Sequence, residues 1–271
     1  MPYLDQALNS ALAQEYENFE VVVIDNASTD GSTQWLRTIE DPRVRVIHRT
    51  ELQPAGENWS EAVNEANGTY IKLLCADDLI DPCIIRDQVT ALELNPLAVM
   101  AASKRRVINA KGKVVKSKHG LSGLSANENG EEAIKKCFLT GTNLLGEPAS
   151  VLFRSEAIKS AMPWHSRWPY VTDIGTYAEV LKNGELVSID QVQASFRIAA
   201  TSWSASLVKQ QEEQFAQWQA SVIQTGFAPL TSWELRRSKG NLKLRSFVRR
   251  QYFAREARRA NSQNSPEREN P

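Results

Sequence analysis

The 271-residue sequence is poor in the features that mark membrane, secreted and zinc proteins. It has no run of about 18 to 20 apolar residues, the length that a membrane-spanning helix needs. Its start, MPYLDQALNS, lacks the basic and apolar segments of a secretory signal. The three cysteines form no C-x-x-C pair and cannot all be joined in disulfides, which predicts buried thiols in a reducing cytoplasm. The three histidines are too scattered to predict a zinc site.

Charge is balanced overall but unevenly distributed. Lys plus Arg and Asp plus Glu number 32 each, yet residues 205–271 carry 12 basic and 6 acidic side chains. The remainder is therefore acidic by the same margin. With 42% hydrophobic residues, the sequence predicts a globular protein of one large or two small domains, an acidic body followed by a basic tail.

Short apolar strands alternate with helices through the first part of the chain. Strands are expected at 19–24, 44–47 and 70–75, and helices at 3–16, 33–39 and 58–66. This alternation predicts an α/β fold with a mainly parallel sheet flanked by helices. Farther along we expect helices at 83–94, 130–138, 155–161 and 173–182, and strands at 98–103, 107–108, 114–115 and 150–153. From residue 207 onward the pattern is helical.

Two of the three early strands end in carboxylates, Asp25 after the first and Asp77 with Asp78 after the third. Aspartate is also a common turn residue, so either position alone is a weak signal. Together they favour a functional site, because ligands of open α/β sheets bind at the carboxyl ends of strands. Carboxylate oxygens are the ligands that Mg²⁺ or Mn²⁺ prefers, and such a cation binds a nucleotide diphosphate as well.

Five segments in order resemble a family 2 inverting glycosyltransferase of the GT-A fold. They are YLDQALNSALAQEYENFEVVVIDNASTDGS (3–32), PAGENWSEAVNEANG (54–68), GTYIKLLCADDLIDP (68–82), GTNLLGEPASVLFR (141–154) and the block SFRIAATSWS (195–204). An acidic helix start at Thr172-Asp173 adds to them. Each motif is loose, but their order is specific, and the resemblance spans about residues 3–205.

The resemblance implies a role for each matching residue. Asp25, with Asn26 and Ser28, matches the site of the nucleotide base, and Asp77 with Asp78 matches the metal-binding motif that steadies the diphosphate. Asp173 matches the general base that deprotonates the acceptor hydroxyl. The donor implied is a nucleotide sugar, usually linked to UDP, and the cofactor Mg²⁺ or Mn²⁺.

Three further residues are candidate contacts with the acceptor or the diphosphate. Arg197 is expected to pair with diphosphate or with a loop carbonyl, or to be a plain structural arginine. Glu147 is expected either to face the acceptor or to stabilise its loop. Trp168 is a candidate for stacking on a sugar, with core packing as the alternative.

The sequence departs from the family pattern in two places. Cys75 stands where the acidic motif normally begins with Asp, so metal binding is expected to rest on Asp77 and Asp78. The family's first β-strand, an apolar run ending near Pro-x-Tyr-Asn, is not found before the helix at 3–16. Two explanations stay open: translation begins upstream of Met1, or the chain is a truncated remnant.

The tail from 231 to 260 carries ten basic and two acidic residues with apolar side chains between them. A basic amphipathic helix suits the surface of an anionic membrane, and the alternative is a helix packed on the catalytic domain with a solvated basic face. No nucleic-acid-binding motif accompanies the charge. The expected organisation is a catalytic domain at 1–205, a helical extension at 206–261 and a disordered end at 262–271.

The resulting hypothesis is an enzyme that moves a sugar from a UDP-sugar to a hydroxyl acceptor with inversion. Its acceptor is expected to be a glycan or a lipid-linked sugar in surface polysaccharide synthesis, and its location the cytoplasm or the inner membrane face. One alternative is a catalytically silent remnant or nucleotide-binding module. The other is a sugar-phosphate nucleotidyltransferase, which needs a Gly-rich basic loop after its first strand.

Overall fold

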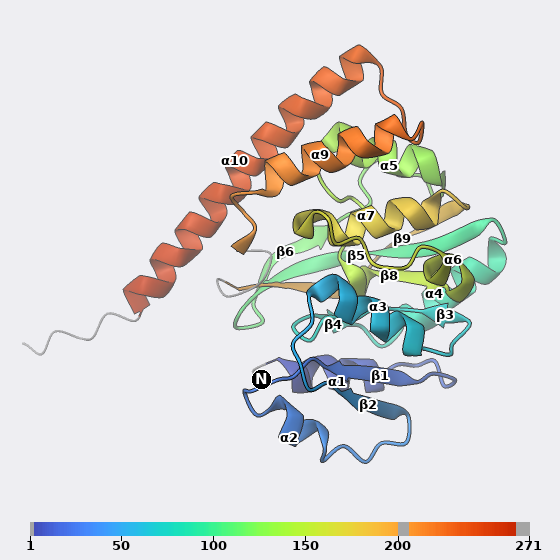
Figure 1. Ribbon diagram of the computed structural model, residues 1–271, viewed down its shortest axis with the longest axis vertical. Coiled ribbons are helices and arrows are strands. Elements are labelled where there is room, and N and C mark those ends of the chain that lie inside the picture. The colour runs from blue at the N-terminus through green and yellow to red at the C-terminus, as the bar shows by residue number, and fades with distance from the viewer. Residues whose placement is uncertain (1–2, 200–205, 264–271) are drawn as a thin grey trace, which may run out of the picture.

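The computed structural model describes residues 3–199 and 206–263. Helices cover a central sheet, and the C-terminal helices lie at the far end from the N-terminal residues (Figure 1). The α-helices are α1 Leu4–Leu12, α2 Ser32–Leu36, α3 Ala55–Glu65, α4 Ile84–Leu94, α5 Gly130–Thr140, α6 Ser155–Ser160, α7 Thr172–Leu181, α9 Gln211–Gln224 and α10 Ser232–Gln263. The 3₁₀ turns are η1 Pro148–Ser150 and η2 Pro169–Val171.

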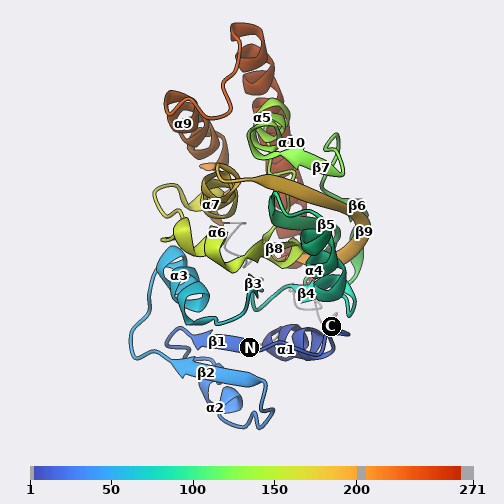
Figure 2. The same ribbon diagram turned by 90° about the vertical axis from the view of Figure 1, so that its right-hand side faces the viewer.

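The strands form two sheets. They are β1 Val21–Asp25, β2 Val44–His48, β3 Tyr70–Ile71, β4 Leu79–Ile80, β5 Ala98–Asn109, β6 Val114–His119, β7 Asn127–Asn129, β8 Val151–Arg154 and β9 Glu185–Ile198. β1 and β2 make a separate two-stranded sheet. The larger sheet has the order β3-β8-β5-β9-β4, with β6 beside β5 and β7 beside β9. Figure 2 shows the β1–β2 pair below the larger sheet, with α1 beside β1.

The α/β class with helices around a central sheet is confirmed, but the expectation of a mainly parallel sheet is wrong. Among the described strands only β1–β2 and β5–β9 pair in parallel, and the other pairs are antiparallel. One cause is local: β6 follows β5 through a tight turn in which Gly112 adopts a φ of 76°. A hairpin of this kind must be antiparallel.

Strands β4, β7 and β9 were not anticipated from the sequence. β9 is the longest strand, with 14 residues, and it pairs with β5 in parallel. In the second half of β9, which ends in ASFRI, polar and apolar residues alternate. The sequence there contains no continuous apolar run that would indicate a buried strand. The third predicted strand is shorter than expected, because β3 ends at Ile71 and the next residue, Lys72, turns its buried ammonium toward the carbonyls of Ala149 and Val151.

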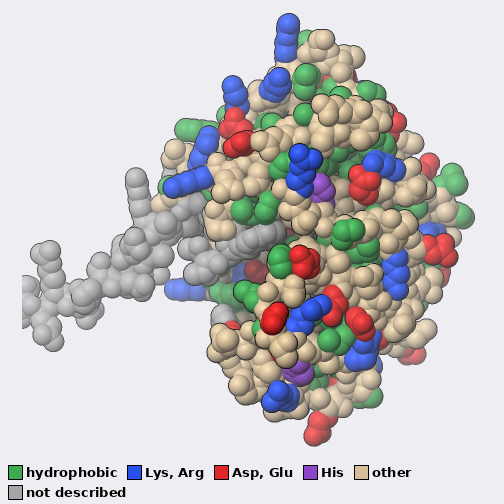
Figure 3. All heavy atoms as spheres, in the orientation of Figure 1, with side chains coloured by type: hydrophobic (Ala, Val, Ile, Leu, Met, Phe, Trp, Pro, Cys, Tyr) green, Lys and Arg blue, Asp and Glu red, His purple; other side chains and the backbone are tan. Residues whose placement is uncertain are grey.

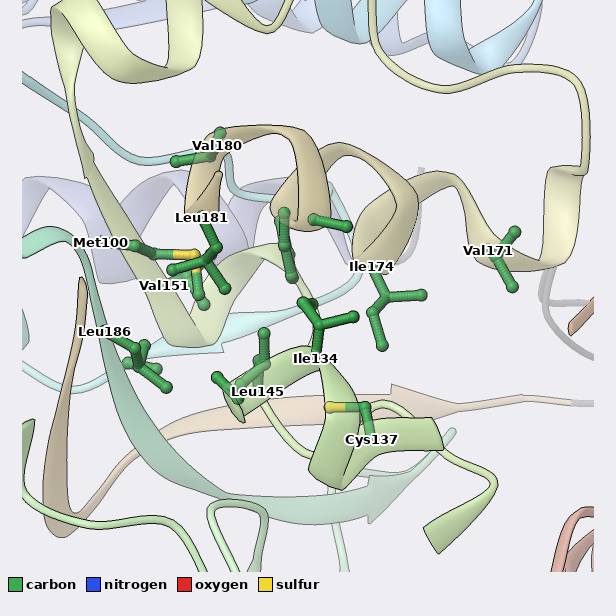
Figure 4. Packing of buried hydrophobic residues seen from close by; sticks show 14 of the residues in the cluster. Met100, Ile134, Cys137, Leu145, Val151, Val171, Ile174, Val180, Leu181 and Leu186 are labelled. Carbon is green, nitrogen blue, oxygen red and sulfur yellow. The ribbon is translucent and has the colours of Figure 1, made fainter. Parts of the chain in front are cut away.

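The main core lies between the sheet and helices α5 and α7. Figure 4 shows Met100 of β5, Val151 of β8 and Leu186 of β9 facing Ile134 of α5 and Ile174 of α7. All five side chains are at most 1% exposed. Each such side chain stabilises the fold by about 1.5–3 kcal/mol through burial. The three cysteines are free, and of the three only Cys137 is fully buried.

The C-terminal helices pack on the helical layer of the body. Ser238 of α10 donates a 2.6 Å hydrogen bond to the Phe138 carbonyl of α5, and Leu242 is 5% exposed. Trp218 of α9 meets the Phe138 ring edge to face at 5.0 Å. In the described part of the chain, no helix has both the length and the apolar character needed to cross a membrane. Most of the predicted disordered end, and residues 200–204 of the SFRIAATSWS block, lie outside the described residues.

Candidate active site

Asp25 is the last residue of β1 and is 3% exposed. Its carboxylate accepts hydrogen bonds from the Thr33 hydroxyl at 2.6 Å and the Ser28 amide at 3.3 Å, and lies 3.0 Å from Nδ1 of His48 on β2. Burial by itself raises the pKa of Asp25, but these hydrogen bonds outweigh it and lower the pKa to about 2. The group is therefore an ionised acceptor at neutral pH, and a carboxylate has about four acceptor positions.

The neighbours of Asp25 shape the adjoining loop. The side chain of Asn26 donates to the carbonyl of Gln53 at 2.9 Å and accepts from its amide at 2.8 Å. Ser28 contributes its backbone amide to Asp25. An open hollow of about 310 Å³ lies beside them, lined in part by His48 and Gln53. The predicted nucleotide residues Asp25, Asn26 and Ser28 thus lie together, with Asn26 bonded to the loop that forms the hollow.

Cys75, Asp77 and Asp78 lie in a turn between β3 and β4, closed by a 3.1 Å hydrogen bond from the Asp78 amide to the Cys75 carbonyl. The cysteine sulfur and one oxygen of each carboxylate all lie within 4.8 Å of one another. Asp78 is 1% exposed. Burial raises the pKa of Asp77, and burial together with the Asp77 charge raises that of Asp78 well above its usual range. Close negative groups of this kind are stabilised by a cation.

This donor set fits a divalent metal ion. Two carboxylates suit Mg²⁺ or Mn²⁺, and the thiol of Cys75 adds a softer donor that Mn²⁺ tolerates better than Mg²⁺ does. Burial and the charges of Asp78 and Asp77 raise the pKa of Cys75 well above its usual value, so without a cation this thiol stays protonated. Asp77 and Asp78 would hold the ion, with Cys75 beside them.

Arg197 on β9 holds the acidic turn in place. It is 1% exposed, its Nε donates to the Asp77 carbonyl at 2.7 Å, and its backbone amide donates to the Asp78 carboxylate at 2.9 Å. Its NH2 reaches Oε1 of Gln6 at 3.0 Å, and its guanidinium lies 4.3 Å from the centre of the Tyr3 ring. The sequence suggested that Arg197 pairs with diphosphate or with a loop carbonyl. In the structure it donates a hydrogen bond to a loop carbonyl, that of Asp77.

Asp173 lies in the first turn of α7. One carboxylate oxygen accepts from the side chain of Asn143 at 2.9 Å and the other from the Ile174 amide at 2.7 Å. Burial raises the pKa of Asp173 to about 6, and the negative charge of Glu147 adds to the shift. A carboxylate with this pKa is ionised at neutral pH and is a stronger base than an ordinary aspartate, as general-base catalysis requires.

Glu147 and Asn143 belong to the loop between α5 and η1. The Asn143 side chain also accepts from the Leu145 and Gly146 amides at 2.9 and 3.2 Å, so it fixes the loop while it orients Asp173. Glu147 forms an ion pair with Arg105 of β5, which is 1% exposed. The loop-stabilising role of Glu147 is therefore present, although its side chain keeps 22% exposure.

Trp168 is part of the core and does not form an open acceptor surface. It is 8% exposed, its indole donates to Gln217 at 2.8 Å, and its ring contacts both His165 and the guanidinium of Arg167. These contacts leave little ring surface for a sugar. Trp168 therefore packs in the core, as in the second of the two roles expected from the sequence.

The acidic turn and the Asp173 region lie within electrostatic range of each other. The charge of Asp173 contributes to the raised pKa of Cys75, and that of Glu147 to the raised pKa of Asp78. The sequence did not single out Asn143 or Arg105. Asn143 lies inside the recognised GTNLLGEP segment, whereas Arg105 sits in the run SKRRV and looks like a solvated charge.

The fold is that of GT-A glycosyltransferases. The chain superposes on S. aureus TarS, residues 1–349 in complex with UDP-GlcNAc, with a TM-score of 0.67, covering 91% of this chain and 69% of that one at 16% identity. At this identity the likeness shows the fold.

The sequence model of glycosyl transferase family 2 matches residues 1–160, and the chain belongs to this family. It is 32% identical over 143 residues to an uncharacterised glycosyltransferase of Rickettsia felis, covering 52% of this chain and 23% of that protein. It is 36% identical over 84 residues to the succinoglycan biosynthesis protein ExoO of Rhizobium meliloti, covering 31% of this chain and 24% of that protein. The chain spans about a quarter of the length of these relatives.

Proposed function

We propose that the protein transfers a sugar from a UDP-sugar to a hydroxyl group of a glycan or lipid-linked acceptor, with inversion. The observation that carries this proposal is the placement of Asp77 and Asp78 within electrostatic range of the Asp173 region on a GT-A fold. The UDP-GlcNAc bound to TarS supports a UDP-sugar donor, and the similarity to ExoO supports a role in polysaccharide synthesis.

In this reaction the acceptor oxygen bonds to the anomeric carbon as the bond to the diphosphate oxygen breaks. Asp173 takes the hydroxyl proton, Asn143 keeps its carboxylate oriented, and Asp25 receives a hydrogen bond from the nucleotide base. Asp77 and Asp78 would hold Mg²⁺ or Mn²⁺, which when bound would supply positive charge to neutralise the departing diphosphate. A single displacement needs one catalytic carboxylate and inverts the anomeric centre, whereas retention by double displacement needs a second as nucleophile.

Titration of the purified chain with UDP, with and without Mn²⁺, tests the donor site. We expect binding that depends on Mn²⁺ and that weakens at least about a hundredfold in Asp77→Asn/Asp78→Asn, because two metal ligands lose their charge. The side-chain amide oxygen introduced by Asp78→Asn can still accept from the Arg197 amide, so the turn keeps its anchor. Glu93→Gln/Glu156→Gln removes the same charge from exposed positions and should leave binding unchanged.

The reaction products distinguish the alternatives. A glycosyltransferase releases UDP from a UDP-sugar, and a nucleotidyltransferase forms or consumes pyrophosphate. If the folded chain binds no nucleotide with any divalent metal, the proposal fails for this chain and the non-catalytic remnant is favoured.

We also propose that α10 contacts an anionic membrane. Its packed side presents Ser238, Leu242 and Ser246. Among the α10 side chains that the structure describes, the large apolar ones that are exposed are Trp233, Leu244, Phe247 and Val248, each at least 55% exposed. Basic side chains with some apolar ones among them lie along the upper left outline of the molecule, where α10 runs (Figure 3). Exposed aromatic and aliphatic groups next to Lys and Arg suit the boundary of an anionic bilayer.

Flotation with vesicles tests this contact. The protein should bind phosphatidylglycerol vesicles more strongly than phosphatidylcholine vesicles, and Leu244→Ser/Phe247→Ser should reduce binding about tenfold or more, since two apolar side chains that would enter the bilayer are lost. Leu94→Ser/Leu97→Ser is the matched control, because these leucines are 76% and 71% exposed on another part of the surface. Equal losses in both variants would contradict the proposal.

A further inference from the structure

Five basic side chains converge beside the loop that carries Asn143. Arg105 of β5 and His119 of β6 are direct partners across the two strands, and the Lys116 ammonium lies 2.8 Å from Nδ1 of His119. Arg245 and Arg249 come from α10, one helical turn apart. We call these five residues the basic cluster. Burial and the charges of the other four lower the pKa of His119 to about 3, so all five lie within electrostatic range.

The cluster holds more positive charge than its surroundings compensate. Among the described residues Arg105 pairs with Glu147, whereas Lys116, Arg245 and Arg249 have no carboxylate within 4.0 Å. Burial lowers the pKa of Lys116, and the charges of Arg105 and Arg245 lower it further. Like charges held this close are unfavourable unless an anion joins them.

Arg105 contributes a buried guanidinium group to the cluster. Its side chain is buried, and its NH1 nitrogen has no hydrogen-bond partner in the described part of the chain. A Cβ atom would lie 2.5 Å from this nitrogen at Gly120 and 3.2 Å from it at Gly146, so the two glycines make room for the guanidinium. A buried donor without a partner is costly, so the charge of Arg105 adds to the need of the cluster for an anion.

The cluster is attached to the catalytic loop at both ends. Arg245 donates to the Thr140 carbonyl at 2.8 Å, and Arg249 reaches the Thr142 hydroxyl at 3.4 Å, just before Asn143. At the other end Arg105 holds Glu147. A group bound to the cluster therefore lies next to the loop whose Asn143 orients Asp173.

We propose that the basic cluster binds a phosphate group of the acceptor, so that the acceptor is a phosphate-bearing glycan or polyol. This inference rests on the proposed function and names its acceptor class. Guanidinium groups match phosphate oxygens with pairs of hydrogen bonds, and a phosphate ester has enough acceptor oxygens for several of these donors. The donor diphosphate is separately accounted for by Asp77 and Asp78.

Titration of the full chain with sn-glycerol 3-phosphate, with glycerol as the neutral match, tests the site by NMR chemical shifts. Glycerol 3-phosphate should bind and glycerol should not. Arg245→Gln/Arg249→Gln should weaken binding at least about tenfold, as expected for the loss of charge-assisted hydrogen bonds. Arg236→Gln/Lys243→Gln removes the same charge from exposed positions of α10 and should change it less than about twofold.

Two further measurements keep the outcomes separate. Lys116→Gln changes an exposed strand residue without touching the contacts of α10 to the body, so a matching loss there shows that the effect is not unfolding. Binding that persists in saturating UDP and Mn²⁺ assigns the cluster to the acceptor, and displacement by UDP would overturn the proposal. Binding to phosphatidylglycerol vesicles without any to glycerol 3-phosphate would also overturn it. If UDP does not bind, the proposed function fails, while the phosphate titration still decides whether the cluster is an anion site.

Discussion

Asp173→Asn is expected to lower kcat by about 10²–10⁴-fold, the usual contribution of a positioned general base. The amide cannot take the acceptor proton, whereas the binding of UDP and Mn²⁺ at Asp25, Asp77 and Asp78 should change little. The assay is UDP release with a donor and acceptor on which the parent protein turns over. Glu179→Gln is the matched control, since Glu179 is an exposed carboxylate on the same helix, α7.

The pH dependence follows from the same carboxyl group. Only the ionised form accepts a proton, so kcat/KM should rise as the pH increases through about 6, the pKa to which burial raises Asp173. This rise should vanish in Asp173→Asn. A full rate in the variant, or a profile that keeps its rise near pH 6, would remove Asp173 from the role of base.

The free energy of unfolding of Asp173→Asn shows whether a loss of activity comes from misfolding. A carboxyl group whose pKa is raised in the folded state contributes stability that is fully present below its ordinary pKa and is lost as the pH rises through the raised pKa, because the folded protein binds the proton more tightly. The neutral amide avoids this cost. At pH 7 to 8 the variant should therefore be at least as stable as the parent, which denaturant unfolding measures.

The sequence located the strands and acidic residues of the donor side because the signals there are local. An apolar run that stops at Asp25, and another that leads to Asp77 and Asp78, can be recognised from a few neighbouring residues. The acceptor side depends on contacts between distant segments. Arg105 is recognisable as a buried site residue only when β5 is paired with β6 and joined to Glu147, and the role of Asn143 only when α7 is packed against its loop.

The packing of the C-terminal helices also depends on contacts that the local sequence does not reveal. Sequence predicts them as a basic extension because their charge differs from that of the body. Ser238, which hydrogen-bonds the Phe138 carbonyl, carries no signal of burial in its residue type, yet it is 0% exposed. The predicted boundary between residues 205 and 206 therefore calls for a measurement of cooperativity.

Phe138→Ala is expected to cost about 3–5 kcal/mol of unfolding free energy, the usual penalty for removing a buried aromatic ring. The ring is 0% exposed and meets Trp218 and Phe215 of α9 edge to face, at centroid distances of 5.0 and 6.4 Å. The loss should lower Tm by on the order of 10 °C for a chain of this length. Leu97→Ala, at a 71% exposed position, should change stability by less than about 0.5 kcal/mol.

The same variant decides whether α9 and α10 unfold with the body. Far-UV circular dichroism follows the whole chain. The chain has seven tryptophans, so the difference in fluorescence between the protein with and without Trp218→Phe reports on the surroundings of Trp218, which is 1% exposed in the interface between α5 and α9. Because that interface is part of the main core, both signals should shift together in a single transition. If fluorescence changes at lower urea concentration than circular dichroism does, the helices after residue 205 form a separate unit. The loss at Phe138 would then weaken their docking and leave the stability of the body nearly unchanged.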